Sequence, residues 1–301
     1  MLKTADLAQR AVKVAYDRTP RRTYAVGTSN GGYQVRRVIE EGPNLFDGGV
    51  DWEGTFVSPY GPNLLIDLPP AIANFPAYVA SGYDDNSAAA QAIRAAGYPP
   101  DVKQTLAGGV IDTLWQRNNT SFWEVTMCQW QKRLDPTYNT YGVPGLGGYN
   151  YQQRTAVSNV FANVVALQTT GKIKKPLVTV AGTMDALLPI NRNARAYEAA
   201  VDASRKGNND QRNAQYRLYE VQNGTHIESY AGVFQPPPPG IPGFQPLVLI
   251  QPHAQAAFDA LVAHVESNAP LPPSQCIPIN GSISAAPSQS GHCAKLFVPN
   301  P

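Results

Sequence analysis

The sequence is poor in charged residues and has no excess of either sign. Only 15% of its 301 residues are Asp, Glu, Lys or Arg, and 24 basic against 22 acidic residues leave a formal charge of +2. A surface that binds nucleic acid or an anionic membrane needs clustered positive charge, and this composition gives no case for one. We therefore expect no nucleic-acid binding. No run of 18 apolar residues is present, so we expect no membrane span either.

Cysteine and histidine are also scarce, with three and four residues. No HExxH motif and no CxxC pair occurs, so we expect neither a metal site nor a cofactor. Cys128 stands alone and is predicted to be a buried apolar side chain. Cys276 and Cys293 lie in a Pro/Ser/Gly-rich tail, where a disulfide would be the main source of order. The predicted disulfide favours an oxidising compartment, and hence a secreted or periplasmic protein, although the first residues do not form a signal peptide.

Apolar residues make up 43% of the chain, and 28 aromatic side chains are present, enough for a sizeable core. Short runs of β-branched, aromatic and apolar residues predict buried strands, and stretches of helical periodicity separate them. Such alternation indicates a mostly parallel sheet in an α/β fold. The strands are predicted at 23–27, 47–52, 176–181 and 216–221. The helices are predicted at 4–17, from after Gly32 to about Glu41, at 192–205 and at 253–267.

Residues 58–171 interrupt this alternation. They contain an Ala/Gln-rich helical stretch at 87–95, a longer Trp-bearing helical region and a Gly/Pro/Tyr loop at 141–149. We predict an inserted, mainly helical cap. The predicted organisation is a first core part at 1–57, the cap at 58–171, a second core part at 172–267, and a Pro/Ser-rich tail at 268–301. The proline run at 235–240 is predicted to be a stiff connector or, alternatively, a ligand for another protein.

The segment from Gly27 to Gly31 reads Gly-Thr-Ser-Asn-Gly, which matches G-x-S-x-G. It lies between a predicted strand and a predicted helix, the context in which this pattern forms a nucleophile elbow. The sharp turn needs small neighbours and exposes the Ser29 hydroxyl at the positive end of a helix. The backbone N–H of Asn30 would then face a developing oxyanion. The alternative is a glycine-rich turn with Ser29 as a helix cap.

A serine nucleophile needs a base. His226 follows the strand predicted at 216–221, at the carboxyl end where catalytic groups gather in open α/β sheets. The other histidines are less suited: His253 begins a helix, His264 lies within one, and His292 is in the tail. Asp185 follows the preceding strand and is the candidate that orients His226, although a turn or helix-cap aspartate would look the same.

The order Ser29, Asp185, His226 is that of α/β-hydrolases. We predict that Ser29 attacks an ester carbonyl, that His226 transfers the proton, and that Asp185 holds the imidazole. Aromatic residues of the cap are candidates to line the substrate cleft, or else form the core of the cap itself. They are Trp115, Trp123 and Trp130, with Phe122, Tyr149 and Tyr151.

At these residues the chain resembles the α/β-hydrolase superfamily, and within it the tannase and feruloyl-esterase group and the related 3-hydroxybutyrate-oligomer hydrolases. The resemblance is carried by the nucleophile segment 24–32 with Phe46-Asp47-Gly48, the acid loop 182–189, the histidine loop 224–226 and the stretch 254–273. It implies a serine esterase acting on a medium or bulky ester, either a 3-hydroxyalkanoate oligomer or an aromatic ester.

The chain departs from this group at two points. Tannase-like enzymes join a cysteine before the nucleophile to one after the histidine, and here those positions are Thr28 and Ile227. The resemblance also begins just before the nucleophile strand, without the about four earlier strands and the second oxyanion donor of a complete hydrolase sheet. We therefore expect an unpaired edge at 23–27 and a chain that is poorly soluble or nearly inactive alone. The alternative function is a non-catalytic, truncated hydrolase-like binding module with an incomplete oxyanion hole.

Overall fold

The computed structural model describes residues 2–206, 215–234, 246–289 and 291–293. The proline run predicted as a connector at 235–240 lies outside these residues.

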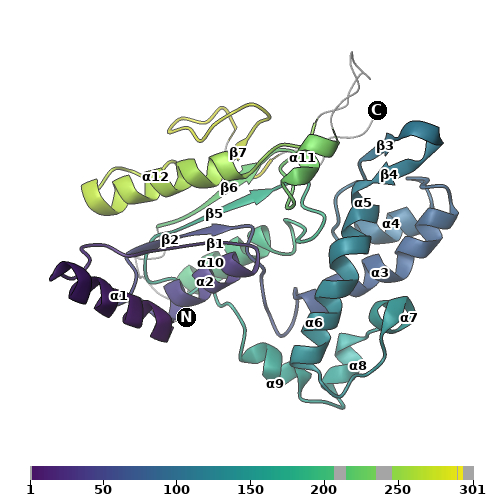
Figure 1. Ribbon diagram of the computed structural model, residues 1–301, viewed down its shortest axis with the longest axis horizontal. Helices are drawn as coiled ribbons and strands as arrows, with labels where there is room; N and C mark the ends of the chain where they lie inside the picture. The colour runs from purple at the N-terminus through teal and green to yellow at the C-terminus, as the bar shows by residue number, and fades with distance from the viewer. Residues whose placement is uncertain (1, 207–214, 235–245, 290, 294–301) are drawn as a thin grey trace.

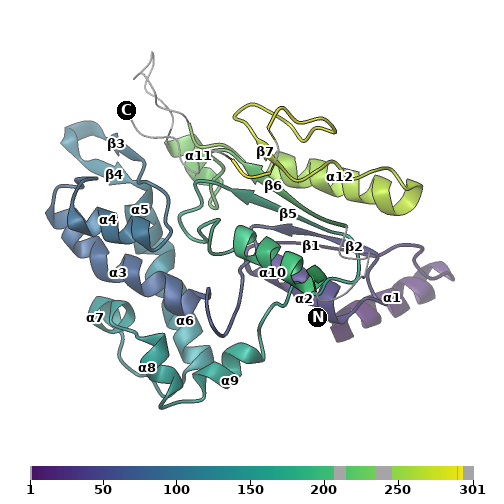
Figure 2. The same ribbon diagram turned by 180° about the vertical axis from the view of Figure 1, so that it is seen from behind.

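A five-stranded parallel sheet forms the centre of the molecule (Figures 1 and 2). Its order is β1-β2-β5-β6-β7, and the strands are β1 (Tyr24–Thr28), β2 (Gly48–Trp52), β5 (Leu177–Gly182), β6 (Tyr216–Val221) and β7 (Gln275–Ile277). Four of them match the predicted strands to within a residue or two. Strand β7 was not predicted, because it is only three residues long and follows a run of prolines.

Successive strand residues point to opposite sides of the sheet, so the apolar strands give it two apolar faces, and helices cover both. On one face, α2 (Asn30–Glu41) and α10 (Ala194–Lys206) pack on a cluster that includes Leu177 and Ala181. On the other face, α12 (Gln251–Ser267) packs on a cluster that includes Val178 and Val180. The expected α/β architecture is confirmed.

The first helix, α1 (Leu2–Tyr16), is as long as predicted, yet no residue of it in the described chain is buried. Its apolar residues Leu7 and Val14 are 66% and 87% exposed. Within the described residues, β1 pairs only with β2, so it forms an edge of the sheet, and Val26 is 54% exposed there. An open edge at this strand agrees with the expectation from the sequence.

The cap segment, residues 58–171, lies at the end of the sheet toward which β5 and β6 run (Figures 1 and 2). It is mainly helical, with one short antiparallel pair of strands. Its elements are α3 (Leu64–Ala80), α4 (Ala88–Ala95), β3 (Lys103–Thr105), η1 (Ala107–Gly109), β4 (Ile111–Thr113), α5 (Leu114–Asn118), η2 (Asn119–Trp123), α6 (Glu124–Leu134), α7 (Gly142–Gly147), α8 (Tyr151–Thr155) and α9 (Val160–Val165).

Helix α3 was not predicted, since it contains Pro69, Pro70 and Pro76. Proline within a helix removes a hydrogen bond and costs about 3 kcal/mol, so sequence propensity argues against a helix here. Burial outweighs that cost: Leu65, Leu68 and other apolar residues of α3 are completely or almost completely buried in the cap core.

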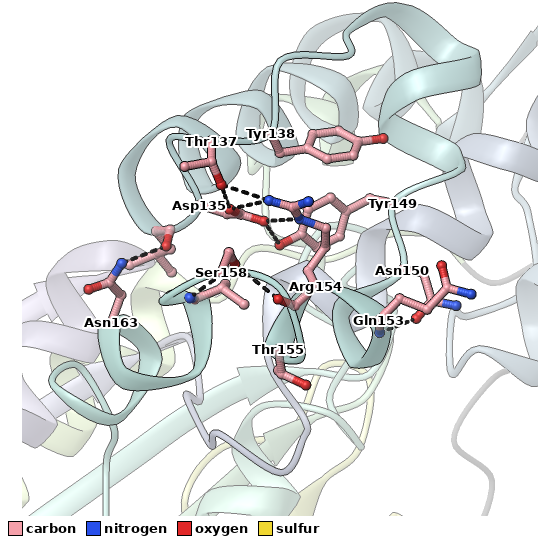
Figure 3. A network of polar contacts seen from close by, with 12 residues as sticks. Asp135, Thr137, Tyr138, Tyr149, Asn150, Gln153, Arg154, Thr155, Ser158 and Asn163 are labelled. Carbon is pink, nitrogen blue, oxygen red and sulfur yellow. Dashed lines mark hydrogen bonds and ion pairs between the residues drawn. The ribbon is translucent and has the colours of Figure 1, made fainter.

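A polar network joins the C-terminal half of the cap segment (Figure 3). The buried carboxylate of Asp135 accepts hydrogen bonds from Arg154 at 2.6 and 2.9 Å, from Tyr149 at 3.0 Å and from Thr137 at 2.9 Å. The side chain of Asp135 is fully buried and that of Arg154 is 20% exposed. These bonds join the end of α6 to α8.

The described residues that follow α12 add strand β7 beside β6. Cys276 in β7 forms a disulfide with Cys293, as predicted, while Cys128 is an unpaired, half-buried thiol beside the cap core. A short helix, α11 (Ser229–Val233), follows the loop after β6. Across the described ranges we find no helix with the length and hydropathy needed to cross a membrane.

Candidate active site

The turn between β1 and α2 is sterically constrained around Ser29. Ser29 has φ 56° and ψ −120°, a region that residues other than glycine rarely adopt, and its N–H donates to the carbonyl of Trp52 at 2.8 Å. A Cβ atom on Gly27 would lie 2.5 Å from the carbonyl carbon of Gly31, so only glycine fits there. The strained turn exposes the serine hydroxyl, as expected for a nucleophile elbow.

The structure brings together the three residues predicted as a triad. His226 Nε2 lies 3.0 Å from Ser29 Oγ, and His226 Nδ1 lies 2.8 Å from Asp185 Oδ2, across sequence separations of 197 and 41 residues. A carboxylate only accepts hydrogen bonds, so Nδ1 carries a hydrogen, and in the neutral imidazole Nε2 is left to accept from Ser29. The other carboxylate oxygen, Asp185 Oδ1, accepts from the N–H groups of Leu187 and Leu188 at 2.8 and 2.6 Å. Asp185 is thereby held in place on both sides.

Strand register explains why these residues meet. The last residues of neighbouring strands stand side by side, with Thr28 opposite Trp52 and Gly182 opposite Val221. Ser29 therefore follows β1, Asp185 follows β5 and His226 follows β6, all at the carboxyl ends of the strands. This is where groups gather in open α/β sheets.

Glu53 also lies at the carboxyl ends of the strands, beside Ser29, Asp185 and His226. It was not predicted from the sequence. It follows β2 directly, and its Oε2 lies 3.7 Å from His226 Nδ1. Its position at the end of a predicted strand was the one available signal. Among the described residues, Glu53, Asp185 and His226 form the one group whose ligand atoms, all within 4.8 Å, could hold a metal ion.

The pKa values of this cluster are displaced. Burial alone would lower the pKa of His226, but the carboxylates of Asp185 and Glu53 act against it and raise the pKa to about 9. Burial raises the pKa of Glu53 to about 8; the His226 charge opposes this change, and the charges of Asp185 and Glu228 add to it. Such displacements are typical of groups that exchange protons in catalysis.

A cavity of about 560 Å³ opens above Ser29, between the sheet and the cap segment. Apolar and uncharged polar side chains make up most of its wall, with one guanidinium, Arg133. Its lining residues are Thr28, Ser29, Asn30, Thr55, Leu64, Phe122, Thr126, Gln129, Trp130, Arg133, Leu187, Leu188, His226 and Ile227. His226 is the single histidine of the described chain in this lining.

The aromatic residues predicted to line the cleft separate into three groups. Trp130 and Phe122 line the cavity above Ser29. Trp115 and Trp123 do not: both are completely buried in the cap core, where their indole N–H groups donate to the carbonyls of Pro99 and Ala186. We therefore withdraw these two as substrate-lining residues. The alternative reading, that they form the core of the cap, fits their positions, because a buried indole needs an acceptor for its N–H.

Tyr149 and Tyr151 line a second cavity, of about 680 Å³, within the cap segment. None of its lining residues is shared with the cavity above Ser29. Asn30, by contrast, lies in the wall above Ser29 as the first residue of α2. The first N–H groups of a helix have no acceptor within it, so the Asn30 N–H remains the predicted oxyanion donor.

Comparison with known proteins gives one family and a set of similar folds. The family model described as 3HB-oligomer hydrolase matches residues 135–293. D-(-)-3-hydroxybutyrate oligomer hydrolases from Burkholderia thailandensis and Burkholderia mallei are 36% and 35% identical to this chain over 134 and 133 residues. Those matches cover 43% and 42% of this chain but only 17% of each relative, so the chain corresponds to a small part of their length.

Among solved structures, feruloyl esterase B from Aspergillus oryzae aligns with a TM-score of 0.51 at 13% identity. The alignment covers 89% of this chain and 64% of the esterase. At this identity the likeness concerns the fold alone. It agrees with the mostly parallel sheet flanked by helices described above.

Proposed function

The chain belongs to the 3HB-oligomer hydrolase family, and from this premise we propose that it is a serine carboxylic-ester hydrolase. The observation that carries the proposal is the continuous hydrogen-bonded series from Ser29 through His226 to Asp185. The strained elbow and the cavity above Ser29 support it further.

The proposed reaction uses these groups in two steps. Ser29 Oγ attacks the ester carbonyl while His226 Nε2 takes its proton, and the carbonyl oxygen becomes an oxyanion that the Asn30 N–H stabilises. The ester bond then breaks, and Nε2 gives the proton to the leaving alcohol, which leaves an acyl group on Ser29. Water repeats the sequence, with its proton passing through His226, and releases the acid. Asp185 keeps the Nδ1 hydrogen in place and stabilises the imidazolium in both steps.

We propose that the substrate is an ester of a hydroxy acid with a free carboxylate, such as a 3-hydroxyalkanoate oligomer. The names of the relatives support this class, and so does the wall of the cavity. Arg133 contributes the wall's one guanidinium, and we find no ion pair for it with another described residue. An oligomer of a hydroxy acid carries one terminal carboxylate, for which a guanidinium is the preferred partner. Phe122 and Trp130 would contact the aliphatic part.

The division of the chain is proposed as well: core parts at 1–57 and 172–267, the cap at 58–171 and the tail at 268–301. The Cys276–Cys293 disulfide supports our proposal that the protein works in an oxidising compartment, secreted or periplasmic.

The experiment that tests the proposed mechanism removes the nucleophile. We expect the Ser29→Ala variant to reduce hydrolysis of a p-nitrophenyl ester to nearly the uncatalysed rate, with unchanged thermal unfolding. Ser87→Ala is the matched control, because Ser87 caps α4 in the cap segment and does not line the cavity. A fluorophosphonate should label Ser29 in the wild-type chain. An unlabelled Ser29 in the folded protein would favour the binding-module alternative.

The substrate class is tested with a 3-hydroxybutyrate dimer and its methyl ester. For Arg133→Gln we expect KM for the free acid to rise about 5- to 10-fold and KM for the methyl ester to stay unchanged. Lys132→Gln serves as the control, since Lys132 precedes Arg133 on α6 but does not line the cavity. Equal effects on both substrates would argue against a carboxylate at Arg133.

A further inference from the structure

Glu53 is a buried acid without a structural partner. Its side chain is 1% exposed, and neither carboxyl oxygen accepts a hydrogen bond of normal geometry from the described residues, although the indole N–H of Trp52 acts on the carboxyl and opposes the rise of its pKa. Burying an ionised carboxylate without hydrogen bonds is costly, so an acid in this position is either neutral or paired with a nearby charge. The stability of the fold gives no reason to keep a glutamate here.

The backbone of Glu53 is held in a demanding conformation that directs it to this place. Its φ is 53°, in the left-handed region that favours glycine, and its N–H donates to the carbonyl of Val180 at 2.8 Å. The next residue, Gly54, has no room for a Cβ atom, which would lie 2.2 Å from Asp51 Oδ1. Backbone strain of this kind costs of order 1–3 kcal/mol and persists mainly at functional sites. The strain points to a role for the Glu53 side chain.

The imidazole of His226 faces the Glu53 carboxyl and can carry the opposite charge. Oε2 lies 3.7 Å from Nδ1, the same nitrogen that donates to Asp185 at 2.8 Å. The two acids differ in the backbone hydrogen bonds that they accept: Asp185 accepts two, whereas Glu53 accepts none. Asp185 is therefore suited to stay charged, and Glu53 is suited to gain and lose a proton.

The other groups around this pair are few. Glu228 adds negative charge and accepts from the N–H groups of Ile250 and Gln251, the indole of Trp52 lies next to Glu53, and Arg133 faces the cavity from α6. With Asp185 charged and the Nδ1 hydrogen in place, Glu53 and His226 hold one further proton between them, either on the Glu53 carboxyl or on Nε2 of His226. His226 is a base for Ser29 only when the proton lies on Glu53 or has left the pair.

On the basis of the proposed serine-hydrolase function, we propose that Glu53 is a positioning residue that shares a proton with His226 and sets the pH range in which His226 acts as a base. The imidazole pKa, raised to about 9, and the Glu53 pKa, raised to about 8, agree with a pair that keeps its proton above neutral pH. Activity should then rise with pH, because deprotonation of the pair frees Nε2, and the midpoint should lie above 6.5, the ordinary value for histidine.

The decisive variant is Glu53→Gln, which keeps the shape and removes the acid. A nearby opposite charge raises a histidine pKa by about 1–3 units, so we expect the acidic limb of kcat/KM to move down by about one unit or more. Glu53→Asp keeps a carboxyl group and should hold the limb nearer the wild-type position. An unchanged limb in Glu53→Gln would overturn the proposal.

The matched control is Glu40→Gln. Glu40 is a buried glutamate of α2 that accepts from Thr170, Gly171 and Tyr197, so its loss should lower stability and leave the limb in place. A limb that moves equally in both variants would show a general effect of lost stability and would also overturn the proposal.

A second measurement covers the case in which Glu53→Gln does not fold. Nuclear magnetic resonance of the wild-type and Ser29→Ala chains can follow the His226 ring and the Glu53 carboxyl carbon directly through pH. We expect both to titrate together above neutral pH. A Glu53 signal that titrates near the ordinary value of about 4.3 would refute the shared proton. Because Ser29→Ala is inactive under the proposed function, this readout separates failure of the inference from failure of that function.

Discussion

The sheet and the cap segment place their functional residues by different means. In the sheet, backbone register brings Ser29, Glu53, Asp185 and His226 together at the carboxyl ends of the strands, and glycines allow the tight turns. In the cap segment, short helices are held by side chains, namely large buried aromatics and the Asp135 network. Substitutions that add backbone bulk should therefore harm the sheet most, and substitutions that remove side-chain contacts should harm the cap most.

The two regions are nevertheless not independent. The core of the cap continues into the acid loop, because Met184, Ala186, Leu187 and Leu188 belong to the same apolar cluster as the cap helices. Trp123 of the cap donates to the carbonyl of Ala186, one residue beyond Asp185. The cap thus helps to position Asp185, the proposed triad acid, as well as covering the cavity.

Among substitutions outside the proposed triad, the largest effect is expected from a single methyl group in the elbow. Gly27→Ala would place Cβ against the backbone of Gly31 and displace the turn, so we expect a loss of activity on the order of 100-fold or more. Gly31→Ala is the matched control, since a Cβ there meets nothing within 4 Å. Esterase assays and thermal melts of both variants test this. Equal harm from the two substitutions would show that the turn is not limited by this contact.

A smaller effect is expected from the cap core. Trp123→Ala leaves a cavity and an unpaired carbonyl on Ala186, so we expect a loss of roughly 3–5 kcal/mol in unfolding free energy. Activity should fall in the folded fraction too, since Asp185 loses support. Trp130→Ala, at the cavity wall, should change KM more than stability. Urea unfolding with parallel kinetics measures both; a reversed pattern would contradict the assignment of the two tryptophans.

The smallest effect is expected from the Asp135 network. Asp135→Asn weakens hydrogen bonds to Arg154, and we expect a loss of about 1.5–3 kcal/mol, the range for bonds to charged groups. Asp112→Asn is the comparison, because the Asp112–Arg117 pair is more exposed and should matter less.

The same network predicts a pH dependence of stability. Burial alone would raise the pKa of Asp135, but the hydrogen bonds from Arg154, Thr137, Tyr149 and Ser158 lower it below its ordinary 3.8. A lowered pKa gives stability that is present above pH 3.8 and is lost as pH falls through the folded value. Unfolding free energies of the wild type and Asp135→Asn should therefore converge in strong acid. A difference that stays constant with pH would contradict a charged Asp135.

Much of the sheet and the triad follows from the sequence, because apolar runs mark β1, β2, β5 and β6 and the chemistry follows their ends. The cap segment follows only in part: its helical character and α4 were predicted, but three prolines disguise α3, and residue type alone cannot tell buried Trp123 from cavity-lining Trp130. Strand β7 is defined by pairing with β6 rather than by its own residues. Glu53 belongs to no motif, and only the register of β2 against its neighbours places it beside His226.

The positions of the tryptophans also make the protein observable without a label. Of the four in the chain, Trp115 and Trp123 are shielded from solvent, and Trp130 lies in the wall of the cavity above Ser29. Their fluorescence should therefore differ in access to a dissolved quencher such as iodide. Loss of iodide quenching at Trp130 would report occupation of the cavity. A red shift of the emission from Trp115 and Trp123 would report opening of the cap, so tryptophan fluorescence would follow the two events separately.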